Sequence, residues 1–208
     1  MLNELLNRYP QLSECADGLR EAVAVLIACY EKGGKLLLCG NGGSCADCDH
    51  ISGELMKGFL KKRPLSSDQK AQMRKKSPQL EDAVMEQLQN GLPAISLPSM
   101  AALNSAFCND VNPDLIYAQS VMALGRTGDV LIAISTSGNA QNVVAAAKTA
   151  KALGLSVIAL TGKTGGKLGE IADICIRVPE TQTYQVQELH LPVYHCLCAE
   201  TEAHFFPV

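Results

Sequence analysis

Short apolar runs alternate with amphipathic helical patterns along this chain, and this alternation is the feature that most limits its fold. Strands that alternate with helices form a parallel sheet covered on both faces, with right-handed crossovers. We therefore predict an α/β fold: a Rossmann-like, three-layer α/β/α arrangement with a five-stranded parallel sheet and an N-terminal helical arm. The predicted strands are Lys35–Cys39, Ala94–Leu97, Val130–Ser135, Ser156–Leu160 and Ile174–Val178.

Helical periodicity fills much of the sequence between these runs. Apolar residues at three- and four-residue steps predict a helix over 12–32, bounded by Pro10 and by Gly33-Gly34. Pro192 should kink the last helix or displace its first turns. The length of 208 residues suits a single domain over 1–208, with N-terminal helices over 1–33. Further helices are expected at 1–9, Ala46–Met56, Met100–Phe107, Leu115–Leu124, Ala140–Ala152 and Tyr184–His204.

Residues 57–92 differ in composition from the rest of the chain. They hold eight of the 18 basic residues, and a shorter acidic cluster follows within the same segment. We interpret 57–92 as an exposed, charged insertion with a helix near Ser77–Leu88.

Bulk composition narrows the class of protein. Hydrophobic residues make up 47% of the chain, which is enough for a core, and the net charge of −3 argues against nucleic acid as a main partner. No apolar run approaches the ~20 residues of a membrane span, and no signal-peptide pattern is visible, so we expect a cytoplasmic protein without a membrane partner. Most of the nine cysteines are expected to pack as small hydrophobic residues.

The first strand runs into the glycine-rich segment Gly40-Asn41-Gly42-Gly43-Ser44, which a helix follows. Glycines let backbone N–H groups turn toward an anion, and a helix N-terminus favours negative charge. The dinucleotide motif GxGxxG fails at Cys45, and the Gly-Lys-Ser/Thr ending of a nucleotide P-loop is absent. The segment is therefore either an anion-binding loop for something other than a nucleotide or a simple tight turn.

A second strand runs into Ser135-Thr136-Ser137-Gly138-Asn139 before a helix. Ligands of parallel sheets bind at the carboxyl ends of the strands, where these hydroxyls should lie. Helix capping is the alternative, but a cap needs only one hydroxyl. The pattern favours a phosphate site.

Together with the later segments LTGKTGGKL and ADICIRVPE, the motifs GNGGS and ISTSGN resemble phosphoheptose isomerases. These are SIS-domain enzymes that convert sedoheptulose 7-phosphate to a heptose 7-phosphate. The resemblance covers most of 1–56 and 94–208, and it implies a SIS-type fold and a phosphosugar isomerase. It also implies a phosphorylated sugar as ligand and a homotetramer with sites between subunits.

The resemblance further implies the residues of a site. It implies a divalent metal, typically zinc, held by residues that match His50, Glu54, Gln187 and His195. It makes Glu54 the base and His195 the acid of an aldose–ketose interconversion through an enediolate, a reaction that needs both groups. The spacing itself puts His50 and Glu54 on one helix face and separates Gln187 from His195 by roughly 80° around their helix. The expected substrate-binding residues are Asn41, Gly42, Gly43, Ser44, Asn104, Ser135, Thr136, Ser137 and Gln187.

Other interpretations remain open at this point. SIS relatives include sugar-phosphate sensors and replication-initiator-associating proteins, as well as lyases, and the paired base and acid favour an enzyme over a sensor. Cys45 and Cys48 form a Cys-x-x-Cys pattern near His50, which a zinc knuckle or a redox pair would also show. His190 suits a core or capping histidine, and Glu188 and Glu54 could simply face solvent.

Three positions depart from the family pattern. A Ser usually stands where this chain has Ala140, and family aspartates fall at Met100 and Tyr184. Asn104 or Ser105 could replace the first of these aspartates. The departures leave the predicted metal and acid–base residues intact but bear on which sugar is bound.

Overall fold

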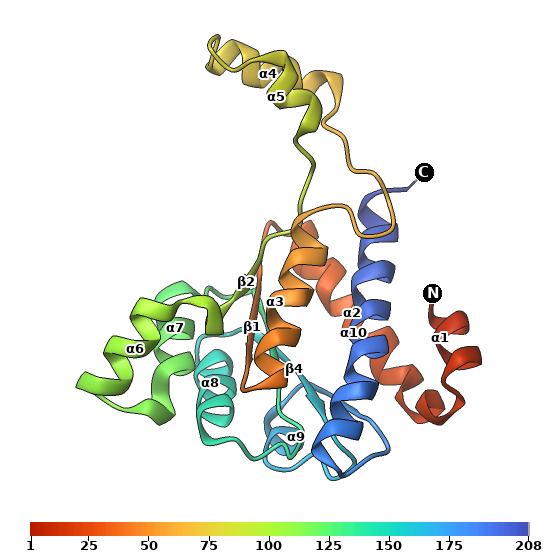
Figure 1. Cartoon of the computed structure of the whole chain (residues 1–208), viewed down its shortest axis with the longest axis vertical. Helices are drawn as coiled ribbons and strands as arrows, with labels where there is room; N and C mark the ends of the chain where they lie inside the picture. Colours follow the sequence, from red (N-terminus) through yellow and green to blue (C-terminus); the bar gives the residue numbers. More distant parts are fainter. Residues whose placement is uncertain (208) are drawn as a thin grey trace.

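The central sheet contains five parallel strands in the spatial order β2-β1-β3-β4-β5 (Figure 1). The computed structural model describes residues 1–207. Each predicted strand is present within one residue of its predicted bounds, and the predicted fold class is confirmed. The strands are β1 (Leu36–Gly40), β2 (Ala94–Ser96), β3 (Val130–Ile134), β4 (Ser156–Thr161) and β5 (Ile174–Arg177).

Alternate residues of the strands enter two separate cores, because successive side chains of a strand point to opposite faces. Leu36 and Leu38 pack with one set of helices, and Leu37 and Cys39 pack with the other. The first core includes residues from α2 (Ala16–Glu31), α3 (Gly43–Met56) and α10 (Thr183–Phe205). The second includes residues from α7 (Ile116–Leu124), α8 (Gln141–Ala152) and α9 (Leu168–Ile171). Both faces of the sheet are thus covered, as its apolar strands require.

The N-terminal arm packs against the last helix. It consists of α1 (Leu2–Arg8), a 3₁₀ turn (Pro10–Cys15) and α2, so the predicted helix over 12–32 begins a few residues late. Leu5 is buried, and the backbone N–H of Leu2 donates to Glu200 Oε1 at 2.9 Å. These contacts join the two ends of the chain along α10.

Helix α10 is continuous from Thr183 to Phe205, and Pro192 lies buried inside it. Pro192 has no N–H to donate to the carbonyl of Glu188, and the helix nevertheless continues through this position. None of the helices within residues 1–207 is both long and apolar enough to cross a membrane.

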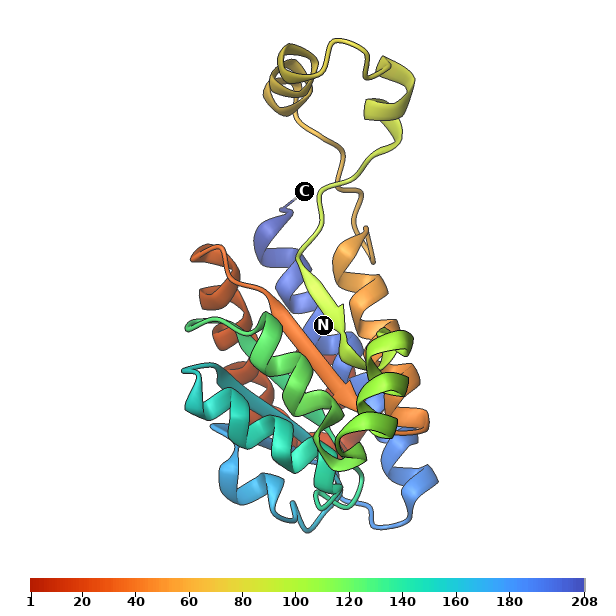
Figure 2. The same cartoon turned by 90° about the vertical axis from the view of Figure 1, so that its left-hand side faces the viewer.

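Two short helices stand away from the body of the molecule within residues 57–92 (Figures 1 and 2). They are α4 (Ser67–Lys76) and α5 (Asp82–Gln87). We predicted a single helix near Ser77–Leu88, but Ser77 adopts a non-helical conformation before Pro78, as residues that precede proline commonly do. The two helices are linked by ion pairs, Lys70–Glu86 at 2.7 Å and Arg74–Asp82.

The remaining α-helix of the body is α6 (Ala101–Asp110).

A buried ion pair anchors the base of this projection. The side chains of Arg63 and Glu202 are both inaccessible to solvent and lie 2.8 Å apart. Glu202 also accepts the backbone N–H groups of Phe59 and Leu60, each at 2.8 Å. Although burial opposes ionisation, these N–H groups and Arg63 hold the pKa of Glu202 below its usual value. The carboxylate therefore ties the segment after α3 to α10.

Replacing Glu202 with Gln should destabilise the fold strongly, because Arg63 would stay buried without a counter-charge. We expect the free energy of unfolding to fall by about 3–5 kcal/mol. Urea unfolding at one fixed protein concentration measures it. Asp82→Asn, which breaks the exposed Arg74–Asp82 pair, is the matched control and should cost less than about 1 kcal/mol. Equal, small losses in the two variants would contradict the anchoring role.

Candidate active site

Two loops lie side by side at the carboxyl edge of the sheet, because β1 and β3 are neighbours in register, with Gly40 opposite Ile134. One loop follows β1 and the other follows β3. Together with the start of α10 they enclose a cavity of about 410 Å³. This is the edge at which parallel sheets bind ligands. The cavity is lined by Asn41, Gly42, Gly43, Ser44, Ile134, Ser135, Thr136, Ser137, Ala140, Thr183 and Gln187.

The first loop needs its glycines for two different reasons. Gly42 has a φ of +56°, which favours glycine. Gly43 lies against α10: a Cβ there would sit 2.5 Å from Gln187 Nε2. Ser44 is buried, while the Asn41 amide exchanges hydrogen bonds with Asn142 at 2.9 and 3.0 Å. The first loop thus contacts α10 through Gly43 and α8 through Asn41.

The second loop offers hydroxyls that the protein does not use elsewhere. Ser137 Oγ accepts the backbone N–H of Asn139 at 3.2 Å, but within residues 1–207 the side chains of Ser135 and Thr136 have no hydrogen-bond partner. The N-cap of α8 is Ala140, and no side chain caps that helix. The hydroxyls are therefore not helix caps, and Ser135 and Thr136 are available to a ligand.

Asn104 is the one predicted substrate-binding residue that does not line this cavity. It lies on α6, where its Nδ2 donates to the carbonyls of Leu97 and Pro98, both at 3.0 Å. Its Oδ1 is buried without a partner. Asn104 shapes the turn after β2, and the structure gives it no contact with the two loops.

A second cluster forms where α3 and α10 pack together. His50 Nε2 lies 3.2 Å from Glu54 Oε1, and the rings of His50 and His195 meet edge to face with centroids 5.0 Å apart. The other carboxylate oxygen of Glu54 accepts from Lys57 at 2.9 Å. The structure thus brings together the predicted base, the predicted acid and His50.

His195 is a half-buried member of this cluster. Its Nε2 is buried and has no hydrogen-bond partner. Burial, followed by the nearby His50, lowers the pKa of His195 below its usual value. His195 is therefore a neutral imidazole at neutral pH, with a lone pair or an N–H free for a ligand.

Gln187 lies apart from the other three predicted metal ligands of its own chain. It precedes His195 by eight residues on a continuous helix, which corresponds to roughly 12 Å along the axis, and it faces Gly43 in the cavity between the loops. In the described part of the chain, no three His, Cys, Asp or Glu side chains come close enough to hold a metal ion. The separation along the axis follows from the spacing once the helix is continuous, but the position of Gln187 against Gly43 does not, because it depends on how α10 packs against the first loop.

Two further residues lie beside the cluster and were not predicted as site residues, and one of them, Tyr194, contacts it directly. The hydroxyl of Tyr194 lies 2.9 Å from His50 Nδ1, and the Tyr194 side chain is almost completely buried. Burial above all, and then the charge of Asp47, raise the pKa of Tyr194. The sequence could have indicated Asp47 as a neighbour of the site, because it precedes His50 by about one helical turn and therefore lies on the same helix face.

The geometry gives no support to a zinc knuckle or redox pair at Cys45 and Cys48, whereas it agrees with a core role for His190 and a solvent-facing Glu188. Cys48 is buried, and burial raises the pKa of both Cys45 and Cys48, which disfavours the reactive thiolates of a redox pair. His190 is completely buried, and burial lowers its pKa to about 4, so it is a neutral core histidine. Glu188 is exposed.

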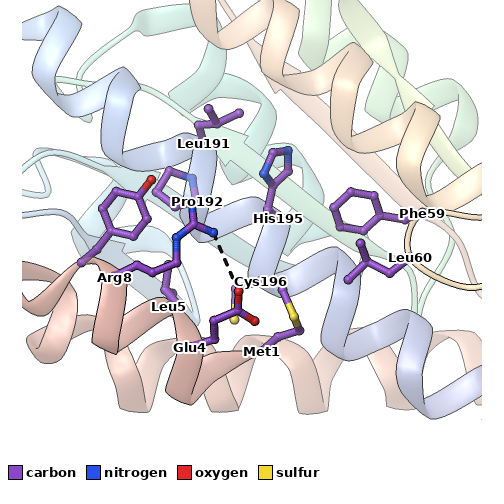
Figure 3. A pocket seen from close by; sticks show the side chains of 11 residues that line it. Met1, Glu4, Leu5, Arg8, Phe59, Leu60, Leu191, Pro192, His195 and Cys196 are labelled. Carbon is purple, nitrogen blue, oxygen red and sulfur yellow. Dashed lines mark ion pairs between the residues drawn. The ribbon is translucent and has the colours of Figure 1, made fainter.

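A larger cavity of about 550 Å³ opens beside His195, between α1, the segment after α3 and α10 (Figure 3). Apolar side chains such as Leu5 and Phe59 contribute much of its lining, and Arg8 and Glu4 form an ion pair at 3.9 Å along α1, on one side of it. It has no hydroxyl-rich loop. The smaller cavity between the loops is the better match to a phosphate.

Comparison with known proteins agrees with this arrangement. A family model described as SIS domain matches residues 2–92 and 83–162. The chain is 41% identical over 194 residues to the phosphoheptose isomerase of Rhodospirillum rubrum, covering 93% of this chain and 89% of the relative. The solved structure of a phosphoheptose isomerase from Neisseria gonorrhoeae superposes with a TM-score of 0.75 at 31% identity, covering 97% of this chain and 94% of that one.

A second solved structure, a phosphoheptose isomerase from Francisella tularensis, gives the same TM-score of 0.75 at 31% identity over 96% of this chain and 95% of its own. The similarity therefore extends through both loops and both helices of the candidate site. The chain belongs to the SIS-domain family of phosphoheptose isomerases.

Proposed function

We propose that this protein is a phosphosugar isomerase that interconverts sedoheptulose 7-phosphate and a heptose 7-phosphate through an enediolate. The observation that carries the proposal is that the carboxylate of Glu54 and the imidazole of His195 lie in one cluster, on two different helices. A protein that only binds a sugar phosphate needs no base and acid placed together. The name of its relatives supports the same class of reaction.

The phosphate group of the substrate would bind in the cavity between the two loops. Ser135 and Thr136 offer unpaired hydroxyls, and the α3 N-terminus adds a favourable dipole. Hydrogen bonds from hydroxyls to an anion are charge-assisted and stronger than neutral ones. These contacts would account for the affinity for the sugar phosphate, while proton transfer would depend on other residues.

Proton transfer would use the cluster between α3 and α10. Glu54 removes the proton from the carbon next to the carbonyl, and His195 supplies a proton on the other side of the enediolate. A neutral imidazole can act as such an electrophile, as in other isomerases that use a histidine of lowered pKa. The Glu54 side chain is only 15% exposed, which limits competition from water.

The donor set of this cluster also suits a divalent metal such as zinc. His50, Glu54 and His195 are nitrogen and oxygen donors of the kind that zinc accepts, and His195 Nε2 is buried without a partner. These three residues would hold the ion only after their side chains move closer together, since no three His, Cys, Asp or Glu side chains of the described residues are placed to bind a metal in this conformation. When bound, it would polarise the substrate carbonyl and stabilise the enediolate.

The fourth expected ligand supports a shared site. Because Gln187 cannot reach the His195 cluster of its own chain, a site that uses both residues needs a second copy of the protein. We therefore propose a homotetramer in which Gln187 of the partner subunit completes each centre. All nine cysteines are free in the structure, which suits the reducing cytoplasm as its location.

Replacing Glu54 with Gln should abolish most turnover while sugar-phosphate binding survives, because Gln keeps the shape of Glu but cannot act as a base. The turnover number should fall about 10²–10⁴-fold. A coupled assay on sedoheptulose 7-phosphate, a binding titration and zinc analysis of the same samples measure the effect. Glu188→Gln, an exposed residue of α10, is the control and should keep wild-type turnover.

Two results would change the assignment. A Glu54→Gln variant with wild-type turnover would place the base elsewhere. Wild-type protein that binds the sugar phosphate but never converts it, even with zinc supplied, would identify a sugar-phosphate-binding regulator.

Replacing Ser135 and Thr136 together with Ala should weaken sugar-phosphate binding, since at least one charge-assisted contact is lost. The expected loss of about 1.5–3 kcal/mol corresponds to a roughly 10–100-fold higher Kd. Isothermal calorimetry measures it. Thr127→Ala removes a hydroxyl at the opposite end of β3, where it donates to Leu153, and should leave Kd unchanged. Unchanged affinity in the double variant would remove the second loop from the site.

Co-expression of two inactive variants tests the shared site. Gln187→Ala and His195→Ala should each be inactive alone. In mixed assemblies, about a quarter of the centres would combine an intact Gln187 with an intact His195 cluster, so activity should reappear. No recovery in assemblies shown to be mixed would mean that each chain carries its own complete site.

A further inference from the structure

We infer that the projection formed by residues 65–88 is an assembly element, which docks on α6 and the 3₁₀ turn Pro113–Leu115 of a second copy of this chain. The inference rests on the proposed assembly of several copies, but it is independent of the proposed reaction. Two surfaces without a packing partner in their own chain carry it, one on the projection and one on the body.

The projection has little packing of its own. None of the ten residues of α4 is buried, and of the six residues of α5 only Met85 is buried. Isolated helices shorter than about 12–15 residues are marginal in water, because helices in proteins gain most of their stability from packing. Figures 1 and 2 both show α4 and α5 away from the body, so the same chain does not supply that surface. The projection therefore needs a partner outside its own chain.

Helix α6 shows the same lack of packing on the body. Six of its ten residues are apolar, yet none of the ten is buried. Leu103 of α6 is exposed, and so are Val111 and Leu115 directly after it. Apolar side chains that gather on one exposed segment mark an interaction surface.

Charge indicates that these two surfaces fit each other. Helix α4 carries four basic residues and one acidic residue, whereas residues 101–115 carry two acidic residues and no basic residue. The ion pairs of α4 with α5 leave Lys75 and Lys76 without an acidic partner in the described part of the chain. Asp110 and Asp114 are the exposed carboxylates of the other surface. Two free cations can thus meet two free anions, and opposite charges fix the partner and the register of an interface.

The apolar parts of the two surfaces match as well. Val84 and Leu88 are exposed on the projection, as Leu103 and Val111 are on the body. Around a two-fold axis the contact is reciprocal, because the projection of each copy then lies on α6 of the other. The assembly closes, and no unpaired projection is left over.

Reversing the charges of Lys75→Glu and Lys76→Glu together should weaken assembly, because glutamates would then face Asp110 and Asp114 of the other copy. Sedimentation velocity over a range of protein concentrations gives the Kd between copies, which should rise at least about tenfold. High salt should reduce the difference, since it screens exposed charges. Adding Asp110→Lys and Asp114→Lys to the same chain restores opposite charges and should return the Kd to near the wild-type value.

Two further variants serve as controls. Lys32→Glu with Lys148→Glu makes the same change of net charge at two exposed lysines outside both surfaces, and it should keep the wild-type Kd. Replacing 65–88 by Asn-Gly removes the projection at its stem, where Pro64 and Gln89 already pair as an antiparallel bridge that a two-residue turn can close. Circular dichroism should show that this variant is folded, and its Kd should rise at least as much as that of the charge-reversed protein.

Photo-cross-linking locates the contact directly. Val84→p-benzoylphenylalanine places the reactive group on the exposed side of the projection. Irradiation should give a band of twice the chain mass on a denaturing gel, and mass spectrometry should find position 84 joined to a peptide from 101–115.

The outcomes separate this inference from the proposed homotetramer. A wild-type Kd in both the charge-reversed and the shortened variants would overturn the inference and leave the homotetramer standing. A weakened charge-reversed variant that the two lysines do not rescue, or a cross-link to another segment, would overturn α6 as the docking surface. Wild-type protein that stays monomeric at every concentration would overturn both proposals.

Discussion

The packing of α3 against α10 is the constraint on which the candidate site depends. Neither helix carries the chemistry alone: α3 supplies His50 and Glu54, and α10 supplies His195. The buried Arg63–Glu202 pair joins the segment after α3 to α10, and Arg63 also donates to the backbone carbonyls of Glu54 and Leu55. An ion pair without access to solvent is held in one geometry, because separating the charges leaves both unsolvated. The last turn of α3, which carries Glu54, is thereby fixed.

The proposed phosphate-binding cavity and the cluster between α3 and α10 are separate parts of the candidate site. The hydroxyls proposed to bind phosphate lie at the carboxyl edge of the sheet, where loop geometry is set by strand register and by a glycine that lies close to α10. The proposed base and acid lie farther along the helices, in a partly buried environment that lowers the pKa of His195. Substrate affinity and turnover should therefore respond to different substitutions.

Helix geometry explains why one chain offers an incomplete metal set. Eight residues of a straight α-helix span roughly 12 Å, and α10 runs without interruption through Pro192. Gln187 and His195 of one chain therefore face different parts of the molecule. A site that needs both is more naturally built between copies, which would couple assembly to activity.

The sequence by itself determined the layers, the five strands and the two loops, because these follow from local periodicity and from glycines and hydroxyls at strand ends. It also placed His50 and Glu54 on one helix face. Only the tertiary structure decided which distant residues meet. It placed Gln187 against Gly43, left Asn104 outside the cavity, and brought Tyr194 to His50, because contacts between elements depend on how helices pack and not on spacing within one helix.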